Sequence, residues 1–129
     1  MDRKLKKWHD QKFILRSKNS QPPMVNEGEV WWMAVGYNIG SEVYGKGSRF
    51  TRPCVIFKKL SNKKFLAVPL TTKPKTGTWF VSFIFQNNHS VACLAEVRSV
   101  DHRRLIEKIG QLSPKDMKKV KDGLRNLIL

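Results

Sequence analysis

Five short apolar runs lie close together along the middle of this chain, and their spacing is the feature that most restricts its fold. Each run is rich in valine, isoleucine, phenylalanine or tryptophan and is bounded by turn-forming residues, a pattern typical of strands joined by tight turns. The runs cover residues 28–35, 53–59, 64–70, 79–85 and 91–97. Short strands at this spacing predict a mainly β domain, of about five to seven strands, that curves into a small barrel.

The C-terminal part is expected to be helical and to pack on this barrel. Asp101 is expected to cap a short helix over residues 102–109, which Gly110 would close in a left-handed conformation. Ser113, followed by proline and aspartate, is a typical start for a last helix. The apolar residues at helical spacing that should face the core are Met117, Val120, Leu124, Leu127 and Ile128.

The chain is expected to divide into a basic helical N-terminal extension with a linker, residues 1–27, and a barrel domain, residues 28–129. No apolar run approaches the roughly 18 residues of a membrane span, and the N-terminus lacks the apolar core of a secretory signal. These features predict a cytoplasmic protein. Cys54 and Cys93 lie in apolar runs, away from metal-ligand neighbours, and are predicted to be free buried thiols; no metal or cofactor is expected.

Charge is the strongest feature of the composition. The net charge is +15, from 25 Lys and Arg against 10 Asp and Glu. Residues 43–95 contain no acidic residue but nine basic ones. A field of one sign attracts polyanions and therefore favours nucleic acid or an acidic protein as the partner. The alternative is that the lysines only keep a small domain soluble.

Arg52 stands directly before Pro53 at the start of the second run. Proline cannot donate to a sheet ladder, so Pro53 is expected to be the first residue of its strand. A hairpin of runs 53–59 and 64–70 would bring Arg52 close to Thr71. A guanidinium beside a hydroxyl is suited to a phosphate group. An arginine that caps the strand end against backbone carbonyls is the alternative, and spacing alone leaves both open.

Several motifs, in this order and spacing, resemble the MazF/PemK family of toxins from type II toxin–antitoxin systems. The resemblance runs from about Gly28 to the C-terminus. It implies an SH3-like barrel and a homodimer that cleaves single-stranded RNA, often mRNA, without a metal ion. It also implies an acidic antitoxin partner and, through the complex with it, DNA binding. The motifs are Gly28-Glu29-Val30-Trp31, Gly40-Ser41-Glu42, Arg52-Pro53, Pro69-Leu70-Thr71-Thr72 and Arg98-Ser99-Val100-Asp101.

The resemblance also implies roles for individual residues. The family's catalytic arginine and threonine match Arg52 and Thr71. The glycine-rich stretch 37–51 matches a mobile loop near the active site, with Glu42 as its recurrent acidic residue. The residues expected to bind RNA are Tyr44, Lys46, Arg49, Thr72, Lys73, Lys75 and Arg98. Tyr44 is also a candidate for base stacking, whereas for Phe50 and Trp79 a place in the core is favoured.

The mechanism implied is attack of a ribose 2′-OH on the adjacent phosphorus. Some family members carry an aspartate with an acid–base role where this chain has Ala95, followed by Glu96. Glu96 and Glu42 are therefore the acid–base candidates, although strand alternation would point Glu96 to the opposite face. His89, expected in a polar turn, is a weaker candidate.

Two points stay open. Arg98 could contact RNA phosphate or pair with Asp101, and Asp101 itself is explained by its capping role. The whole protein could also be a degenerate or CcdB-like toxin that binds RNA or a protein target without cleavage. The pair of Arg52 and Thr71 favours the ribonuclease, and Ala95 favours the alternative.

Overall fold

The structure is a computed structural model that describes residues 22–35 and 51–129. The predicted N-terminal helix and nearly all of the glycine-rich stretch lie outside these ranges. The elements, in chain order, are β1 (Glu29–Ala34), β2 (Thr51–Lys59), β3 (Lys64–Thr71), β4 (Phe80–Phe85), β5 (Asn88–Cys93), the 3₁₀ turn η1 (Leu94–Glu96), β6 (Arg98–Asp101), the 3₁₀ turn η2 (His102–Arg104), β7 (Leu105–Gln111) and α2 (Pro114–Ile128).

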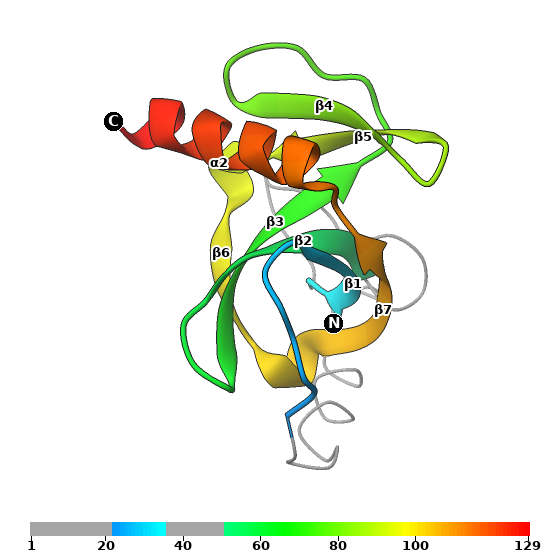
Figure 1. Cartoon of the computed structure of the whole chain (residues 1–129), viewed down its shortest axis with the longest axis vertical. Helices are drawn as coiled ribbons and strands as arrows, with labels where there is room; N and C mark the ends of the chain where they lie inside the picture. Colours follow the sequence, from blue (N-terminus) through cyan, green and yellow to red (C-terminus); the bar gives the residue numbers. More distant parts are fainter. Residues whose placement is uncertain (1–21, 36–50) are drawn as a thin grey trace, which may run out of the picture.

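The strands form one antiparallel sheet in the order β4-β5-β3-β2-β1-β7. β3 is shared, because β6 pairs with its first half and β5 with its last two residues. In Figure 1, β1, β2, β3, β6 and β7 curve around the lower part of the molecule, while α2 lies across the upper part beside the β4–β5 hairpin. The predicted mainly β barrel with a helical C-terminus is confirmed.

β2 and β3 are buried on both faces, which explains their continuous apolar runs. Cys54 and Ile56 belong to the core inside the barrel, whereas Val55 between them belongs to a second core under α2. Phe65 of β3 likewise faces the barrel, and Val68 faces the second core. The two strands therefore separate two hydrophobic cores.

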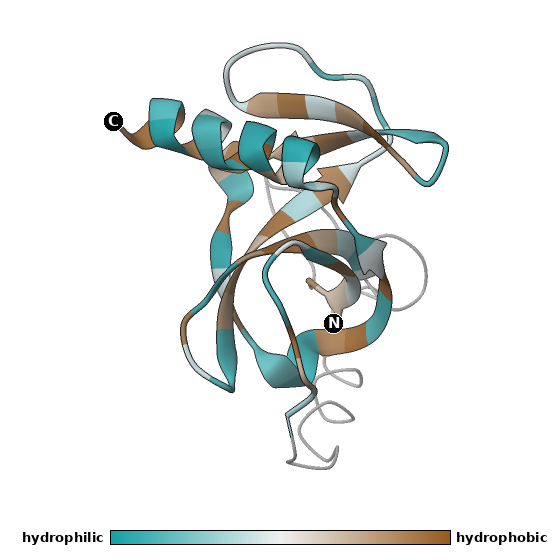
Figure 2. Cartoon of the chain, viewed as in Figure 1, coloured by the Kyte–Doolittle hydropathy of each residue, from teal (hydrophilic) through white to brown (hydrophobic). Residues whose placement is uncertain are grey.

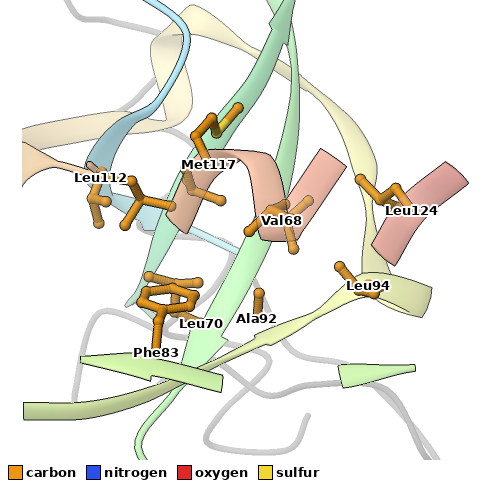
Figure 3. Packing of buried hydrophobic residues seen from close by; sticks show 11 residues of the cluster. Val68, Leu70, Phe83, Ala92, Leu94, Leu112, Met117 and Leu124 are labelled. Carbon is orange, nitrogen blue, oxygen red and sulfur yellow. The ribbon is translucent and has the colours of Figure 1, made fainter. Parts of the chain in front are cut away.

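The second core lies between α2 and the sheet (Figure 3), where Met117 and Leu124 pack over residues of β3, β5 and η1. The helix begins as predicted, since the Ser113 hydroxyl accepts a hydrogen bond from the Asp116 N–H at 3.1 Å. The outer face of α2 is hydrophilic (Figure 2). The prediction for Ile128 was wrong: it is 72% exposed, because the last turn of α2 projects beyond the sheet (Figure 1).

The predicted helix over residues 102–109 was also wrong. Only His102–Arg104 form a 3₁₀ turn, and the chain then pairs with β1 as β7. Gly110 is not a left-handed cap, since it does not have a positive φ. Its role is steric: a Cβ there would lie 2.8 Å from Nε2 of Gln86, whose side chain donates to the Ile109 carbonyl at 2.9 Å.

The β4–β5 hairpin turns more tightly than the predicted polar turn over residues 86–90. Gln86 and Asn87 have φ values of 51° and 66° and form the whole turn between Phe85 and Asn88, as in two-residue hairpin loops. β5 therefore begins at Asn88 and ends at Cys93, earlier than the predicted strand 91–97. His89 lies in a strand, not in a turn.

Glu29 is a buried carboxylate at the junction of β1 and β7. Its Oε1 accepts hydrogen bonds from the Asn26 N–H at 3.0 Å and from the Trp31 indole at 3.1 Å. Its Oε2 lies 3.0 Å from Nζ of Lys108 on β7. Burial alone would raise the pKa of Glu29, but these donors outweigh it and the pKa is lowered.

Candidate active site

Arg52 lies near the start of β2 with its side chain buried, at 6% exposure. It pairs with Met33 of β1 and shares the inner face of the barrel with Cys54. Its guanidinium donates from Nη1 to the Leu70 carbonyl of β3 at 3.1 Å. Burial lowers the pKa of Arg52, although an arginine remains protonated in proteins. The site therefore contains a fixed positive charge shielded from water.

Thr71 is the last residue of β3 and is 7% exposed. Cys54 pairs with Pro69, and continuing this register places Arg52 opposite Thr71. The Thr71 hydroxyl accepts a hydrogen bond from the Lys73 N–H at 3.2 Å. The hairpin predicted from the sequence is thus confirmed, and it brings the guanidinium to the residue next to Thr71.

The predicted position of Pro53 was wrong by two residues. It is the third residue of β2, since the strand starts at Thr51 and pairs with β1 from there. The ladder to β3 starts only at Cys54. The missing N–H of Pro53 therefore lies just outside that ladder, where it breaks no bond.

Charged groups surround the two free thiols beside Arg52. Burial raises the pKa of Cys54 to about 12, against the opposing positive charges of Arg52 and Arg98. Burial also raises the pKa of Cys93, where Arg52 and Lys75 oppose the rise and Glu96 adds to it. Both cysteines are free and buried, as predicted.

Glu96 lies in η1, directly after β5, and not in a strand. The expectation that strand alternation would point it away from the site therefore does not apply. It is half-buried and acts on the same thiol as Arg52. A carboxylate is thus present directly after β5, one residue beyond Ala95.

Arg98 begins β6 and is exposed. Its Nη1 lies 3.5 Å from the carbonyl oxygen of Val35, at the end of β1. The Asp101 carboxylate instead binds Arg103, with Nε at 2.9 Å, and caps η2. The alternative in which Arg98 pairs with Asp101 is therefore not the arrangement observed.

Arg104, at the end of η2, was missed in the sequence, where it stands in a basic triplet without a motif of its own. Its Nη1 donates to the Ala34 carbonyl at 3.1 Å. Burial lowers the pKa of Arg104, and the positive charge of Arg98 lowers it further. Two guanidinium groups are thus held together at the end of β1.

The remaining predicted RNA-binding residues fall into two groups. Thr72, Lys73 and Lys75 are exposed in the loop that follows β3. Glu42 and three of the RNA-binding candidates, Tyr44, Lys46 and Arg49, lie outside the described residues, as does Phe50.

The prediction that Trp79 lies in the core was wrong, since this residue is 57% exposed. Its carbonyl accepts a hydrogen bond from the Leu94 N–H of η1 at 2.9 Å. An exposed indole therefore stands beside the turn that carries Glu96. His89 is exposed on β5, opposite Ile84 of the edge strand β4.

Two further observations concern residues 22–35 and 51–129. Within them, no three His, Cys, Asp or Glu side chains gather as ligands of a metal ion would. In the same ranges, no helix combines the length and the apolar character needed to cross a membrane.

Comparison with known proteins gives a family and a fold. A family model described as PemK-like, MazF-like toxin of type II toxin–antitoxin system matches residues 26–128. The comparison with curated proteins gave no match.

Solved structures share the fold at low sequence identity. A mycobacterial endoribonuclease in complex with its cognate antitoxin has a TM-score of 0.65 at 17% identity, over 81% of this chain and 95% of that one. MazF from Deinococcus radiodurans has a TM-score of 0.62 at 18% identity, over 82% and 97% of the two chains. A MazE–MazF complex from the same organism gives 0.59 at 16% identity, over 82% and 96%.

Proposed function

The chain belongs to the PemK-like, MazF-like toxins of type II toxin–antitoxin systems, and on this premise we propose that it is a metal-independent endoribonuclease that cuts single-stranded RNA. The observation that carries the proposal is the buried guanidinium of Arg52. It is held 3.1 Å from the Leu70 carbonyl, beside Thr71. A preorganised cation in a site shielded from water is suited to the charge that develops at a phosphate in the transition state.

The reaction proposed is an internal transesterification. The 2′-oxygen of a ribose forms a bond to the adjacent phosphorus, and the bond from phosphorus to O5′ breaks. The 2′-hydroxyl proton passes to a base, and the leaving O5′ receives a proton. The products are a 2′,3′-cyclic phosphate and a 5′-hydroxyl. Arg52 would stabilise the extra negative charge of the five-coordinate phosphorus by about 3 kcal/mol.

Thr71 has the position to hold the same phosphate. Its hydroxyl oxygen accepts from the Lys73 N–H at 3.2 Å, so the hydroxyl proton can donate to a phosphate oxygen. Lys73 and Lys75 add positive charge in the exposed loop beyond β3. The exposed Trp79 beside η1 offers a surface on which an unpaired base can stack.

Glu96 is the described residue best suited to be the base. Arg52 cannot fill this role because it stays protonated. The Glu96 carboxylate and the Arg52 guanidinium both shift the pKa of Cys93, the last residue of β5. Glu42 remains a candidate from the stretch outside the described residues.

The partners proposed follow from charge. Residues 43–95 form a region without acidic side chains within a chain of net charge +15. This excess of positive charge favours two partners: RNA, with mRNA as the substrate, and an acidic antitoxin that neutralises the toxin. We further propose a homodimer that acts in the cytoplasm and that binds DNA only through its antitoxin complex.

The test is cleavage of a long unstructured RNA in EDTA, with the fragment ends mapped. Arg52→Ala should lower the rate by 10²- to 10³-fold. The matched control is Lys58→Ala, because Lys58 is an exposed cation on the same strand and its loss removes the same charge. Discrete cuts with 5′-hydroxyl ends that depend on Arg52, in variants with unchanged thermal unfolding, are the expected result.

The second candidate function is binding of RNA or of a protein target without cleavage. Ala95 favours it, because this position lacks the aspartate that some family members use. If the folded protein, free of antitoxin, cuts no RNA of diverse sequence, this second function replaces the first. Equal cleavage by Arg52→Ala and the wild type would instead remove Arg52 from the mechanism.

A further inference from the structure

Two arginines from separate elements meet at the end of β1, next to the proposed active site. Arg98 starts β6 and Arg104 ends η2. Their Nη1 atoms lie 3.5 Å and 3.1 Å from two consecutive carbonyl oxygens, those of Val35 and Ala34. These contacts join residues 63 and 70 positions apart. The tertiary fold, not the local sequence, therefore builds the pair.

The pair keeps two positive charges close together. Arg98 lowers the pKa of Arg104, second only to burial and ahead of the opposing effect of Asp101. Holding like charges together costs free energy, and a bound anion would offset that cost. The 3.1 Å bond to the Ala34 carbonyl orients Arg104, and the longer 3.5 Å contact with the Val35 carbonyl holds Arg98 at the same end of β1.

The pair also lies close to Arg52. Cys54 pairs with Trp31 on β1, and both Arg98 and Arg52 act on its thiol. The end of β1 and the residue after it connect the three arginines: Met33 pairs with the backbone of Arg52, and the next two carbonyls accept from Arg104 and Arg98. The backbone of Arg52 and the guanidinium groups of Arg104 and Arg98 therefore adjoin three consecutive residues, Met33, Ala34 and Val35.

We propose that Arg98 and Arg104 form a second phosphate site, which binds a backbone phosphate of the RNA next to the one held by Arg52. The identity of the ligand as RNA rests on the proposed function. Arginine has five N–H donors in a planar fork, and the Val35 carbonyl takes one of those of Arg98. The exposed part of the Arg98 fork can therefore bind a phosphate through two hydrogen bonds, while the half-buried Arg104 adds positive charge beside it.

Arg103 supplies a matched control. It belongs to the same 3₁₀ turn and its side chain is 45% exposed, but Asp101 holds its guanidinium at 2.9 Å. Arg103→Gln removes the same charge from nearly the same place without touching the proposed site. A difference between Arg98→Gln and Arg103→Gln therefore reports the site and not the overall charge.

The first measurement is binding of an uncleavable 2′-O-methyl oligonucleotide of eight nucleotides and mixed sequence, by fluorescence anisotropy over a range of salt concentrations. Arg98→Gln should weaken binding several-fold and reduce the slope of log Kd against log salt by about 0.7, the value for one phosphate contact on a single strand. Arg103→Gln should change both quantities less. This measurement does not depend on cleavage, so it stays informative if the proposed ribonuclease activity fails.

The second measurement compares cleavage of an octanucleotide with that of a dinucleotide, which contains only the scissile phosphate. Arg98→Gln should lower kcat/KM for the octanucleotide relative to the dinucleotide by about tenfold. Arg104→Gln should do the same, with thermal unfolding recorded because it also loses the bond to Ala34. If the two arginines had only a structural role, their loss would lower kcat/KM equally for both substrates.

Three outcomes would overturn the proposal. The first is equal affinity and equal salt slope for Arg98→Gln and Arg103→Gln. The second is an equal loss of kcat/KM for the octanucleotide and the dinucleotide in Arg98→Gln. The third is weaker binding of a glutamate-rich peptide with unchanged affinity for the oligonucleotide, which would assign the pair to carboxylates instead of phosphate.

Discussion

Replacing Glu29 by glutamine removes a buried negative charge from the junction of β1 and β7 with almost no change in the size of the side chain. Glu29 is 3% exposed and joins the segment before β1 to Trp31 and to Lys108. Because β1 and the residue after it adjoin all three arginines of the proposed sites, the stability of this junction bears on function as well as on folding.

The contacts of the two carboxylate oxygens set the expected size of the effect. Glutamine can keep the two hydrogen bonds to Oε1, but as bonds to a neutral acceptor, which are weaker by about 1 kcal/mol each. The other oxygen becomes an amide N–H₂ that faces the Lys108 ammonium. Lys108 is 47% exposed, so the lost ion pair adds less than about 1 kcal/mol. We expect Glu29→Gln to lower the free energy of unfolding by about 2–3 kcal/mol at pH 7.

This penalty should depend on pH in one direction. The folded pKa of Glu29 is lowered, so its ionised form stabilises the fold fully above the ordinary carboxyl pKa of about 4.3, and this contribution is lost as the pH falls through the folded pKa. The variant has no such group. The difference in free energy of unfolding between wild type and Glu29→Gln should therefore shrink below about pH 4.

Urea unfolding at pH 7 and at pH 3.5 measures both quantities. Asp122→Asn is the control, because it removes the same charge from an exposed pair with Lys118 on α2 and should change stability by less than about 0.5 kcal/mol. A penalty for Glu29→Gln no larger than that of Asp122→Asn, or one that is the same at both pH values, would refute the reasoning.

Two other predictions concern the buried thiols and α2. Cys54 and Cys93 should not react with an aromatic disulfide reagent at pH 8 in the folded protein, because burial raises the pKa of both and that of Cys54 to about 12; rapid labelling in native buffer would contradict this. Gly123→Ala should destabilise the protein by about 1 kcal/mol despite a better helix propensity, since the new Cβ would lie 2.8 Å from both Leu94 Cδ1 and Val81 Cγ2. A higher temperature of thermal unfolding would contradict this, because it would mean that Leu94 and Val81 can move aside at little cost in free energy.

The parts of the fold that the sequence predicted correctly depend on local signals. The β2–β3 hairpin has a short polar turn between two apolar runs, and α2 has its Ser113 cap and an apolar stripe. Residues 102–109 were misread because Leu105 and Ile109 are spaced as in a helix. Pairing with β1, which lies more than 70 positions away, decides their conformation and overrides the local preference.

The candidate site follows the same division. Arg52 and Thr71 could be brought together from the sequence because one hairpin joins them. The position of Glu96 depends on β5 ending at Cys93. The position of Arg104 depends on a hydrogen bond to the Ala34 carbonyl. The residues next to Glu96 and Arg104 in the sequence do not predict either feature. Exposure of Trp79 was also missed, because an aromatic residue beside an apolar run looks the same whether it is covered or not.

The long separation between Arg104 and Ala34 also has a consequence for the order in which a newly made chain acquires its parts. Contacts between near neighbours form early in folding, whereas closing a loop of 70 residues comes late. During synthesis, the hairpin that carries Arg52 can form before the ribosome has released β7. The second cationic site can appear only after the C-terminal third has been made. A chain truncated before β6 would therefore contain Arg52 in its hairpin but would lack the second phosphate site that binds a longer RNA.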